Sequence, residues 1–335
     1  MTRATGRRWR GFIARNIPGG RRTPFPLLPY ALSMPNALPL LVLVPLLLAA
    51  CAVPGTRPPR PLFQFGLLAD VQFADKDTAG SRTYRQALPL LRACAADLAQ
   101  RDLAFIAQLG DIIDDRQTAA LSKADLERVL APLEATGHPL LHVIGNHCLS
   151  VPRPDLEARL GLDTSWYSQV QTGWRFVVLD SMAFSIHSDQ RLEAEAWLEG
   201  QKSKDTPNAR AWNGGFGPQQ LQWLAQQLQA AEDAGQHVVI FAHHPIEPAS
   251  STPSHLAWDH AEAHALITAS PATVAYFNGH DHAGGYAQSN GVHFWTLPAL
   301  LESTAAPNAY AIVEVWPDHL LVQGRGEVQT RKLRR

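Results

Sequence analysis

The stretch Phe105-Ile106-Ala107-Gln108-Leu109-Gly110-Asp111-Ile112-Ile113-Asp114 joins an apolar run of strand length to a glycine and an acidic residue. Open α/β sheets carry their functional residues just beyond the carboxyl ends of their strands. The stretch therefore predicts a buried strand that ends at a functional carboxylate, Asp111. Two similar junctions flank it, at 67–72 and 142–147, and two histidine pairs follow later apolar runs, at 241–245 and 277–282.

Strands and helices are expected to alternate in the first half of the chain. The sequence predicts strands at 63–69, 104–109 and 140–144 and helices at 84–101 and 122–136, the second helix with Ser122 as its N-cap and Asp125 near the third helical position. This order predicts parallel strands with right-handed crossovers. Later strands are expected at 174–179, 237–242, 273–277, 292–297, 309–315 and 319–322, and later helices at 218–234 and 259–268. The polar segment 189–212 has no clear period and is a candidate lid or specificity loop.

The first 50 residues differ from the rest of the chain. They hold seven arginines, no acidic residue, and an apolar run from Leu38 to Ala50. That run is shorter than the ~20 residues of a membrane span, so it predicts the apolar region of a signal peptide. Met34 precedes the run and is a possible true start.

The apolar run ends in Leu48-Ala49-Ala50-Cys51, which resembles the lipobox of bacterial lipoproteins. This resemblance implies a lipid on Cys51 and an extracytoplasmic protein anchored on the periplasmic side of a bacterial membrane. The alternative is an ordinary secretory cleavage site. Residues 51–61 contain four prolines and predict a tether, and 62–335 is expected to be a single, monomeric domain.

Removing residues 1–50 leaves 22 basic and 30 acidic residues, a net charge of −8. A protein this acidic attracts nucleic acids and anionic surfaces poorly, so no nucleic-acid partner is expected. Besides Cys51 the sequence has only Cys94 and Cys148. A disulfide between them is possible in an oxidising compartment. We do not expect one, because Cys94 lies in a helical pattern and Cys148 in the candidate site.

The five junctions supply carboxylate, amide and imidazole side chains. This mixture suits Mn²⁺, Fe or Zn²⁺ and differs from a structural cysteine site. One Gly-Asp or Gly-Asn-His alone is more often a turn. Five such junctions in one chain predict a single metal centre, with Asp111 bridging two ions.

The order of the junctions resembles the calcineurin-like metallophosphoesterase superfamily. The matching stretches are Asp70-Val71-Gln72, Gly110-Asp111-Ile112-Ile113-Asp114, Gly145-Asn146-His147, His243-His244-Pro245 and Gly279-His280-Asp281-His282. Most members have His where this chain has Gln72. One branch has Gln there, the manganese-dependent ADP-ribose/CDP-alcohol diphosphatases, and this branch is also similar at 69–75, 175–181, 212–216, 220–224, 284–286 and 324–326.

The resemblance implies a four-layer α/β/β/α sandwich with mixed sheets. It also implies two divalent ions, Mn²⁺ first, with Fe, Mg²⁺ or Zn²⁺ as alternatives. One ion would be held by Asp70, Gln72, Asp111 and His282, and the other by Asp111, Asn146, His243 and His280. A hydroxide bridging the ions would attack phosphorus. His147 is the candidate catalytic donor to the leaving group, and Asp114 orients it or a ligand.

The expected activity is hydrolysis of the phosphoanhydride in a nucleoside diphosphate linked to an alcohol or sugar, such as ADP-ribose or CDP-choline. The alternatives are a broad phosphodiesterase or phosphomonoesterase outside the cytoplasm and a lipid-anchored binding protein whose site has decayed at Gln72. A candidate substrate site comprises Phe73, Asn213, Gly214, Gly215 and Phe216, in which an aromatic ring could stack on the nucleobase; the alternative is a plain turn. His255, His260 and His264 are expected on the surface.

Overall fold

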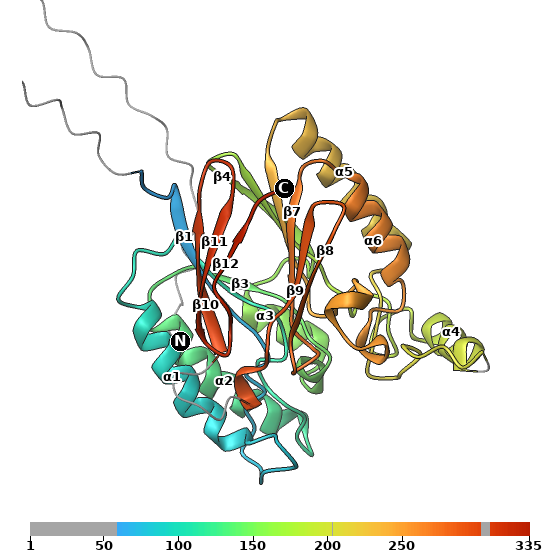
Figure 1. Cartoon of the computed structure of the whole chain (residues 1–335). Coiled ribbons are helices and arrows are strands. Elements are labelled where there is room, and N and C mark those ends of the chain that lie inside the picture. The colour runs from blue at the N-terminus through green and yellow to red at the C-terminus, as the bar shows by residue number, and fades with distance from the viewer. Residues whose placement is uncertain (1–58, 203, 303–308) are drawn as a thin grey trace, which may run out of the picture. The chain divides into compact units, whose positions relative to one another are not determined.

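The computed structural model describes residues 59–202, 204–302 and 309–335 (Figure 1). The expected signal peptide, Cys51 and most of the tether lie outside the described residues. Residues 58–335 form one compact unit. Within the described ranges, no helix is both long and apolar enough to cross a membrane.

The first sheet has six strands in the order β12-β11-β10-β1-β2-β3. Its strands are β1 (Phe63–Leu68), β2 (Ile106–Gln108), β3 (Leu140–His142), β10 (Ala309–Val315), β11 (Leu320–Gly326) and β12 (Arg331–Leu333). β1, β2 and β3 pair in parallel, as the strand–helix alternation predicted. The connections run through α1 (Ala87–Leu98) and α2 (Ala119–Glu134). β10 adds antiparallel to β1, so the sheet is mixed.

The second sheet has the order β4-β5-β6-β7-β9-β8. Its strands are β4 (Tyr167–Gln171), β5 (Trp174–Val178), β6 (His237–Phe241), β7 (Thr273–Asn278), β8 (Gly285–Ser289) and β9 (Val292–Thr296). The four central strands are parallel, and β4 and β8 are antiparallel edges. α5 (Gly217–Asp233) and α6 (His260–Ala269) pack on this sheet.

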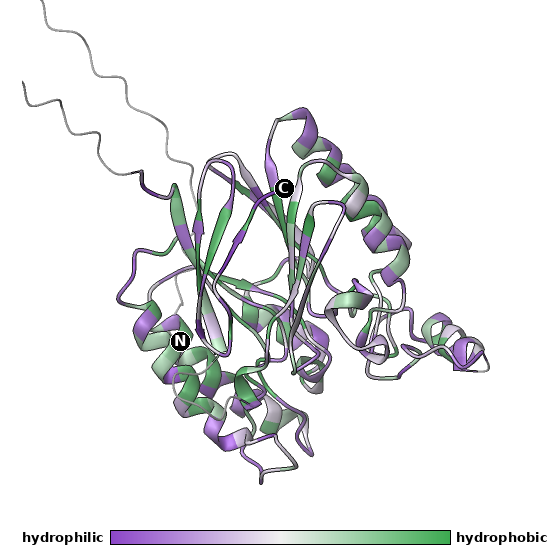
Figure 2. Cartoon of the chain, in the orientation of Figure 1, coloured by the Kyte–Doolittle hydropathy of each residue, from purple (hydrophilic) through white to green (hydrophobic). Residues whose placement is uncertain are grey.

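Three apolar clusters hold these layers together. Between the two sheets, Phe65, Phe105, Phe176 and Phe241 pack with ring centroids 4.8–6.4 Å apart. A second cluster lies between the first sheet and α1 and α2, and a third between the second sheet and α5 and α6. Figure 1 shows α1 and α2 on the outer side of the first sheet and α5 and α6 on the outer side of the second, and Figure 2 shows hydrophilic residues interspersed along those helices. The expected α/β/β/α sandwich is confirmed.

Several local predictions were wrong. α2 begins at Ala119, because the Thr118 hydroxyl accepts the Leu121 N–H and caps the helix; Ser122 is buried inside it. Asp125 pairs with Arg116 instead of closing a capping box. The helix expected at 84–101 begins with the 3₁₀ turn η1 (Tyr84–Gln86). The sequence did not predict α3 (Arg153–Leu160), α4 (Arg191–Lys202), β4, β8, β12 or the 3₁₀ turns η2 (His147–Ser150), η3 (Pro248–Ser250), η4 (Pro253–His255) and η5 (Leu300–Glu302). The candidate lid 189–212 therefore contains a helix.

The buried His142 at the end of β3 makes stability depend on pH. Burial lowers the pKa of His142 from 6.5 to about 4, and Arg159 adds to the effect. The unfolded chain takes up this proton below about pH 6.5, whereas the folded chain does so only near pH 4. The free energy of unfolding therefore falls as the pH drops across this window.

We expect the wild type to lose about 2 kcal/mol more stability between pH 7 and pH 5 than the variant His142→Gln. The variant keeps an acceptor for the Gln108 side chain, which lies 3.2 Å from His142. Urea unfolding at the two pH values measures the difference. Equal losses in the two proteins would contradict the assignment.

Candidate metal centre

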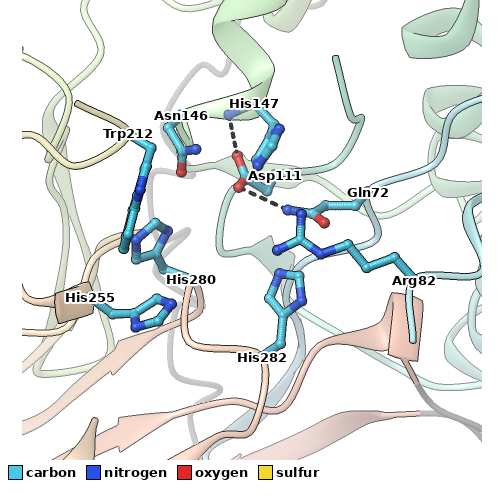
Figure 3. Close-up of a pocket in the computed structure, with 9 residues that line it drawn as sticks. All are labelled: Gln72, Arg82, Asp111, Asn146, His147, Trp212, His255, His280 and His282. Carbon is cyan, nitrogen blue, oxygen red and sulfur yellow. Dashed lines mark hydrogen bonds between the residues drawn. The ribbon is translucent and has the colours of Figure 1, made fainter. Parts of the chain in front are cut away.

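All the side chains expected to hold metal lie where strands of the two sheets end. Asp70 and Gln72 follow β1, Asp111 follows β2, Asn146 follows β3, His243 follows β6, and His280 and His282 follow β7. The carboxyl ends of parallel strands meet at one edge of a sheet. Both sheets present this edge to the same cavity, so segments far apart in the sequence meet there (Figure 3).

The backbone is strained at four of these residues. Asp70, Gln72, Asp111 and His280 have φ values of 49°, 40°, 46° and 72°, in the left-handed region that non-glycine residues avoid. Such strain costs about 1–3 kcal/mol per residue and is concentrated at functional sites. Glycine is needed beside them, because a Cβ at Gly145 would overlap the Asp111 carboxylate. The strands thus turn sharply to bring the side chains inward.

The His243 ring is held by a hydrogen bond that decides where its lone pair points. Its Nδ1 lies 2.9 Å from the Leu109 carbonyl oxygen, which can only accept, so Nδ1 donates. In the neutral ring Nε2 then carries the lone pair. Nε2 lies 3.1 Å from Asp111 Oδ2 and 3.2 Å from Asn146 Oδ1.

His280 is held in the same way, by a different partner. Its Nε2 lies 2.9 Å from Asn213 Oδ1. The Asn213 amide donates to the carbonyls of Asn208 and Ser254, at 3.0 and 2.8 Å, so its oxygen is free only to accept. His280 Nε2 is therefore the donor, and its Nδ1 lone pair faces His243 Nε2 at 3.2 Å.

These hydrogen bonds direct electron-rich atoms toward one point. The ligand atoms of Asp111, His243 and His280 lie within 4.8 Å of one another, and Asn146 Oδ1 adjoins them. Acceptors that face one another at such distances repel unless a cation lies between them. The arrangement therefore fits a metal ion, with a protein partner on the far side of each imidazole.

The second half of the centre is formed by Asp70, Gln72 and His282. The His282 Nδ1 lies 3.0 Å from Glu302 Oε1, which turns Nε2 toward Asp70 Oδ1 at 3.9 Å. Gln72 Nε2 donates to Asp111 Oδ2 at 3.2 Å. Its Oε1 is buried without a hydrogen-bond partner among the described residues. A buried carbonyl oxygen with no donor is costly, and a second cation would satisfy it.

The two buried carboxylates differ in acidity. Burial raises the pKa of Asp70 to about 6, although His243 and His282 oppose it. Burial also disfavours ionisation of Asp111, but His243 and His147 outweigh it and lower the pKa of that carboxyl. Asp111 is therefore ionised at neutral pH and suits the bridging position between two cations.

His147 lies at the cavity beside Asp114. Its backbone N–H donates to Asp111 Oδ1 at 2.9 Å, and its Nδ1 lies 3.2 Å from Asp114 Oδ1. Burial disfavours its charged form, but Asp111, Asp114 and Asp115 outweigh this and raise the pKa of His147 to about 11. Lys76 Nζ also contacts Asp114 Oδ1, at 2.9 Å. His147 is thus a cationic donor held by Asp114.

The cavity over these side chains has a volume of about 260 Å³ (Figure 3). Its lining comprises Gln72, Arg82, Asp111, Asn146, His147, Trp212, His255, His280 and His282. The sequence did not single out Arg82 or Glu302, placed Trp212 only in the candidate lid and in the branch-like stretch 212–216, and predicted His255 on the surface. These residues come from loops and from the 3₁₀ turns η4 and η5 and carry no metal-ligand pattern, so the pattern of strand ends did not place them at the cavity.

The structure contradicts the candidate substrate site. Phe73 and Phe216 are 1% and 2% exposed and pack in two different apolar clusters, so neither ring can stack on a ligand in the cavity. Gly215 pairs with Phe184 through two backbone hydrogen bonds, and a Cβ at Gly214 would overlap the Ser181 carbonyl. The segment 213–216 is therefore packed against neighbouring backbone, and Asn213 orients the ring of His280, one of the proposed ligands.

Two further residues of the site have structural roles. His244 is buried; its Nδ1 lies 2.8 Å from Ser181 Oγ, and its ring packs on His280 with centroids 3.9 Å apart. Cys148 is 1% exposed in the cluster beneath α1 and α2, so it is a packing residue. Cys94 and Cys148 are both buried free thiols.

The chain is similar to several curated enzymes over most of its length. It is 36% identical over 294 residues to the manganese-dependent ADP-ribose/CDP-alcohol diphosphatase of Oryza sativa subsp. japonica, covering 79% of this chain and 92% of that protein. It is 30% identical over 305 residues to the protein of the same name from Arabidopsis thaliana, covering 82% and 98%. No protein-family model matches the chain.

Solved structures support the same relationship. A dimetal phosphatase from Danio rerio is 29% identical and superposes with a TM-score of 0.76, covering 82% of this chain and 99% of that one. A purple acid phosphatase from yellow lupin is 13% identical, with a TM-score of 0.51 and coverage of 80% and 52%. The second likeness concerns the fold alone.

We expect Asn213→Leu to weaken Mn²⁺ binding by roughly 10–100-fold, because His280 loses the acceptor that fixes its tautomer. Titration calorimetry with MnCl₂ measures this without any substrate. Gln219→Leu likewise replaces a side-chain amide by leucine, at an exposed position of α5, and should leave the affinity unchanged. Wild-type affinity in Asn213→Leu would show that this amide does not support the metal centre.

Proposed function

We propose that this chain, which belongs to the manganese-dependent ADP-ribose/CDP-alcohol diphosphatase family, hydrolyses the phosphoanhydride of nucleoside diphosphates linked to a sugar or an alcohol. ADP-ribose and CDP-choline represent the two substrate types. The observation that carries the proposal is the converging donor set with the unpartnered Gln72 oxygen. It combines the residues of a dinuclear site with the amide that is typical of this branch.

Two sets of side chains are the proposed ligands. Asp70, Gln72, Asp111 and His282 hold one ion, and Asp111, Asn146, His243 and His280 hold the other. When bound, the two divalent ions activate a water molecule and neutralise charge that develops on the phosphoryl oxygens. The amide of Gln72 is a harder donor than imidazole, which favours Mn²⁺ over Zn²⁺.

His147 is the proposed catalytic donor. It is cationic at neutral pH and lines the cavity, so it can donate a hydrogen bond to the phosphate as its charge rises. Asp114 Oδ1 lies 3.2 Å from its Nδ1 and forms an ion pair with the charged ring, and Lys76 in turn balances the charge of Asp114. Such preorganised donors stabilise the transition state more than the bound substrate.

The products distinguish this function from its alternatives. Cleavage of the phosphoanhydride releases a nucleoside monophosphate and a phosphorylated sugar or alcohol. A broad phosphodiesterase would attack single phosphate esters as readily. A binding protein with a decayed site would be inactive with every metal, yet every other ligand position of the pattern besides Gln72 is retained.

We further propose that the chain is an extracytoplasmic lipoprotein, anchored in a bacterial membrane by a lipid on Cys51. The apolar run from Leu38 to Ala50 and the small residues before Cys51 support this. The proline-rich segment 51–61 would separate the anchor from the enzyme. A monomer suffices for catalysis, because one chain supplies every proposed ligand.

We expect the wild type to release AMP from ADP-ribose and CMP from CDP-choline when Mn²⁺ is supplied. Asp111→Asn should lower kcat/KM by more than about 100-fold, since the bridging charge is lost. Asp77→Asn makes the same change at a side chain that is 96% exposed, and should keep full activity. Nucleotide products resolved by chromatography provide the measurement, and full activity in Asp111→Asn would disprove the metal assignment.

Gln72→His should shift the metal preference from Mn²⁺ toward Zn²⁺, because an imidazole replaces the amide oxygen. The measurement is kcat/KM for ADP-ribose with each metal in turn. An unchanged preference would mean that Gln72 does not bind the ion.

In a bacterial host, the full-length chain should enter the detergent phase of Triton X-114, and its N-terminal peptide should carry an acylated Cys51. Cys51→Ser should remain in the aqueous phase, because the lipid has no attachment site. Cys94→Ala, at a buried thiol in α1, is the matched control. Detergent partitioning of Cys51→Ser like that of the wild type would refute the anchor.

A further inference from the structure

Arg82 is a cationic side chain of the cavity that has no role in the proposed mechanism so far. Besides the proposed ligands and His147, the cavity is lined by Arg82, Trp212 and His255. The Arg82 side chain is 38% exposed, so it reaches both protein and solvent. Figure 3 shows its guanidinium extending into the space between Gln72 and His282. It is therefore placed to meet a ligand that lies on the metal centre.

The backbone around Arg82 is held in place. Ala79 and Arg82 exchange two backbone hydrogen bonds, of 3.2 and 3.1 Å, across a tight turn that Gly80 permits with φ +60°. The next residue, Thr83, donates its hydroxyl to the Leu301 carbonyl at 3.0 Å. Fixing the base of the side chain reduces the entropy lost when the guanidinium binds a ligand.

The guanidinium is only weakly engaged by the protein. Among the described residues it forms one ion pair, with its Nε 3.7 Å from Glu302 Oε1. That distance is beyond a hydrogen bond. The same Oε1 lies 3.0 Å from His282 Nδ1, so Glu302 is already committed to a proposed ligand. The planar fork of Arg82 keeps donors for an anion such as a phosphate.

The proposed substrate carries a second phosphate beside the one that is attacked. A nucleoside diphosphate ester carries one negative charge on each phosphate. The water oxygen bonds to the attacked phosphorus and its proton is released to solvent, while the bridging P–O bond breaks and its electron pair stays on the bridging oxygen. The second phosphate leaves with that oxygen and gains a negative charge.

We propose that Arg82 binds this second, leaving phosphate and thereby makes the site selective for diphosphates over single phosphate esters. The proposal rests on the proposed function and specifies its substrate class. Arginine binds phosphate through paired, charge-assisted hydrogen bonds, and these strengthen as the leaving group gains charge. A substrate with one phosphate has no group to place there.

The test compares ADP-ribose, which carries a second phosphate, with bis(p-nitrophenyl) phosphate, which has a single phosphate and no nucleoside, both with saturating Mn²⁺. Arg82→Ala should lower kcat/KM for ADP-ribose by roughly 10–100-fold, the usual range for lost hydrogen bonds to a charged group. For bis(p-nitrophenyl) phosphate we expect a change below about threefold. Arg82→Lys keeps the charge without the fork and should lie between the wild type and Arg82→Ala on ADP-ribose.

Two controls separate substrate binding from support of the metal. Arg85→Ala removes a nearby exposed arginine that pairs with Asp75 and Asp77 outside the cavity, and should leave both activities unchanged. Glu302→Gln weakens the hold on His282 and should lower both activities and the Mn²⁺ affinity measured by calorimetry.

Equal losses on both substrates in Arg82→Ala, together with weaker Mn²⁺ binding, would overturn the proposal in favour of a role through Glu302. Unchanged activity on ADP-ribose would overturn it as well. In both cases, activity of the wild type on ADP-ribose would still support the proposed function. A wild type without activity on ADP-ribose would contradict both the proposed function and the role of Arg82.

Discussion

The centre depends on hydrogen bonds made on the far side of its histidine rings. The Leu109 carbonyl, the Asn213 amide oxygen and the Glu302 carboxylate each face one nitrogen of His243, His280 or His282. The other nitrogen of each ring is thereby turned inward. Because these partners come from the residue that follows β2, from the 213–216 segment and from η5, the centre forms only when these separate parts of the sandwich are folded around it.

The sandwich in turn provides rigidity for a strained site. Left-handed backbone at four proposed ligands is unfavourable for an isolated chain and persists only where the surroundings determine it. Phe65 and Phe105 from the first sheet pack against Phe176 and Phe241 from the second. This packing fixes the two sets of strand ends relative to each other, which is what the dinuclear arrangement needs.

The sequence predicted which side chains converge on the cavity far better than it predicted what holds them there. Proposed ligands such as Asp111 and His243 directly follow apolar strands, so local pattern and chain order were sufficient to bring them together. Asn213 was correctly noticed but given the wrong role, because its contacts with Asn208 and Ser254 exist only in the folded chain. Phe73 looked like a ligand-stacking ring for the same reason: its burial depends on the layer that covers it. Similarly, Thr118 and Ser122 are both acceptable N-caps by residue type, but in the structure Thr118 caps α2 and Ser122 is buried within the helix.

Gln72 differs from the three histidines of the centre, because its proposed ligand atom is oriented without a separate hydrogen-bond acceptor behind the side chain. An imidazole has its two nitrogens on different sides of the ring, so each histidine that binds a metal requires a separate acceptor behind it. A side-chain amide carries its oxygen and nitrogen at the same end. Gln72 therefore donates to Asp111 Oδ2 while its own Oε1 stays available at the centre. The amide links one proposed ligand directly to the Asp111 carboxylate, and it does so without adding charge. Replacing it by histidine would change the proposed donor atom and would also remove the hydrogen bond that supports Asp111, so the two effects of Gln72 cannot be changed separately by this substitution.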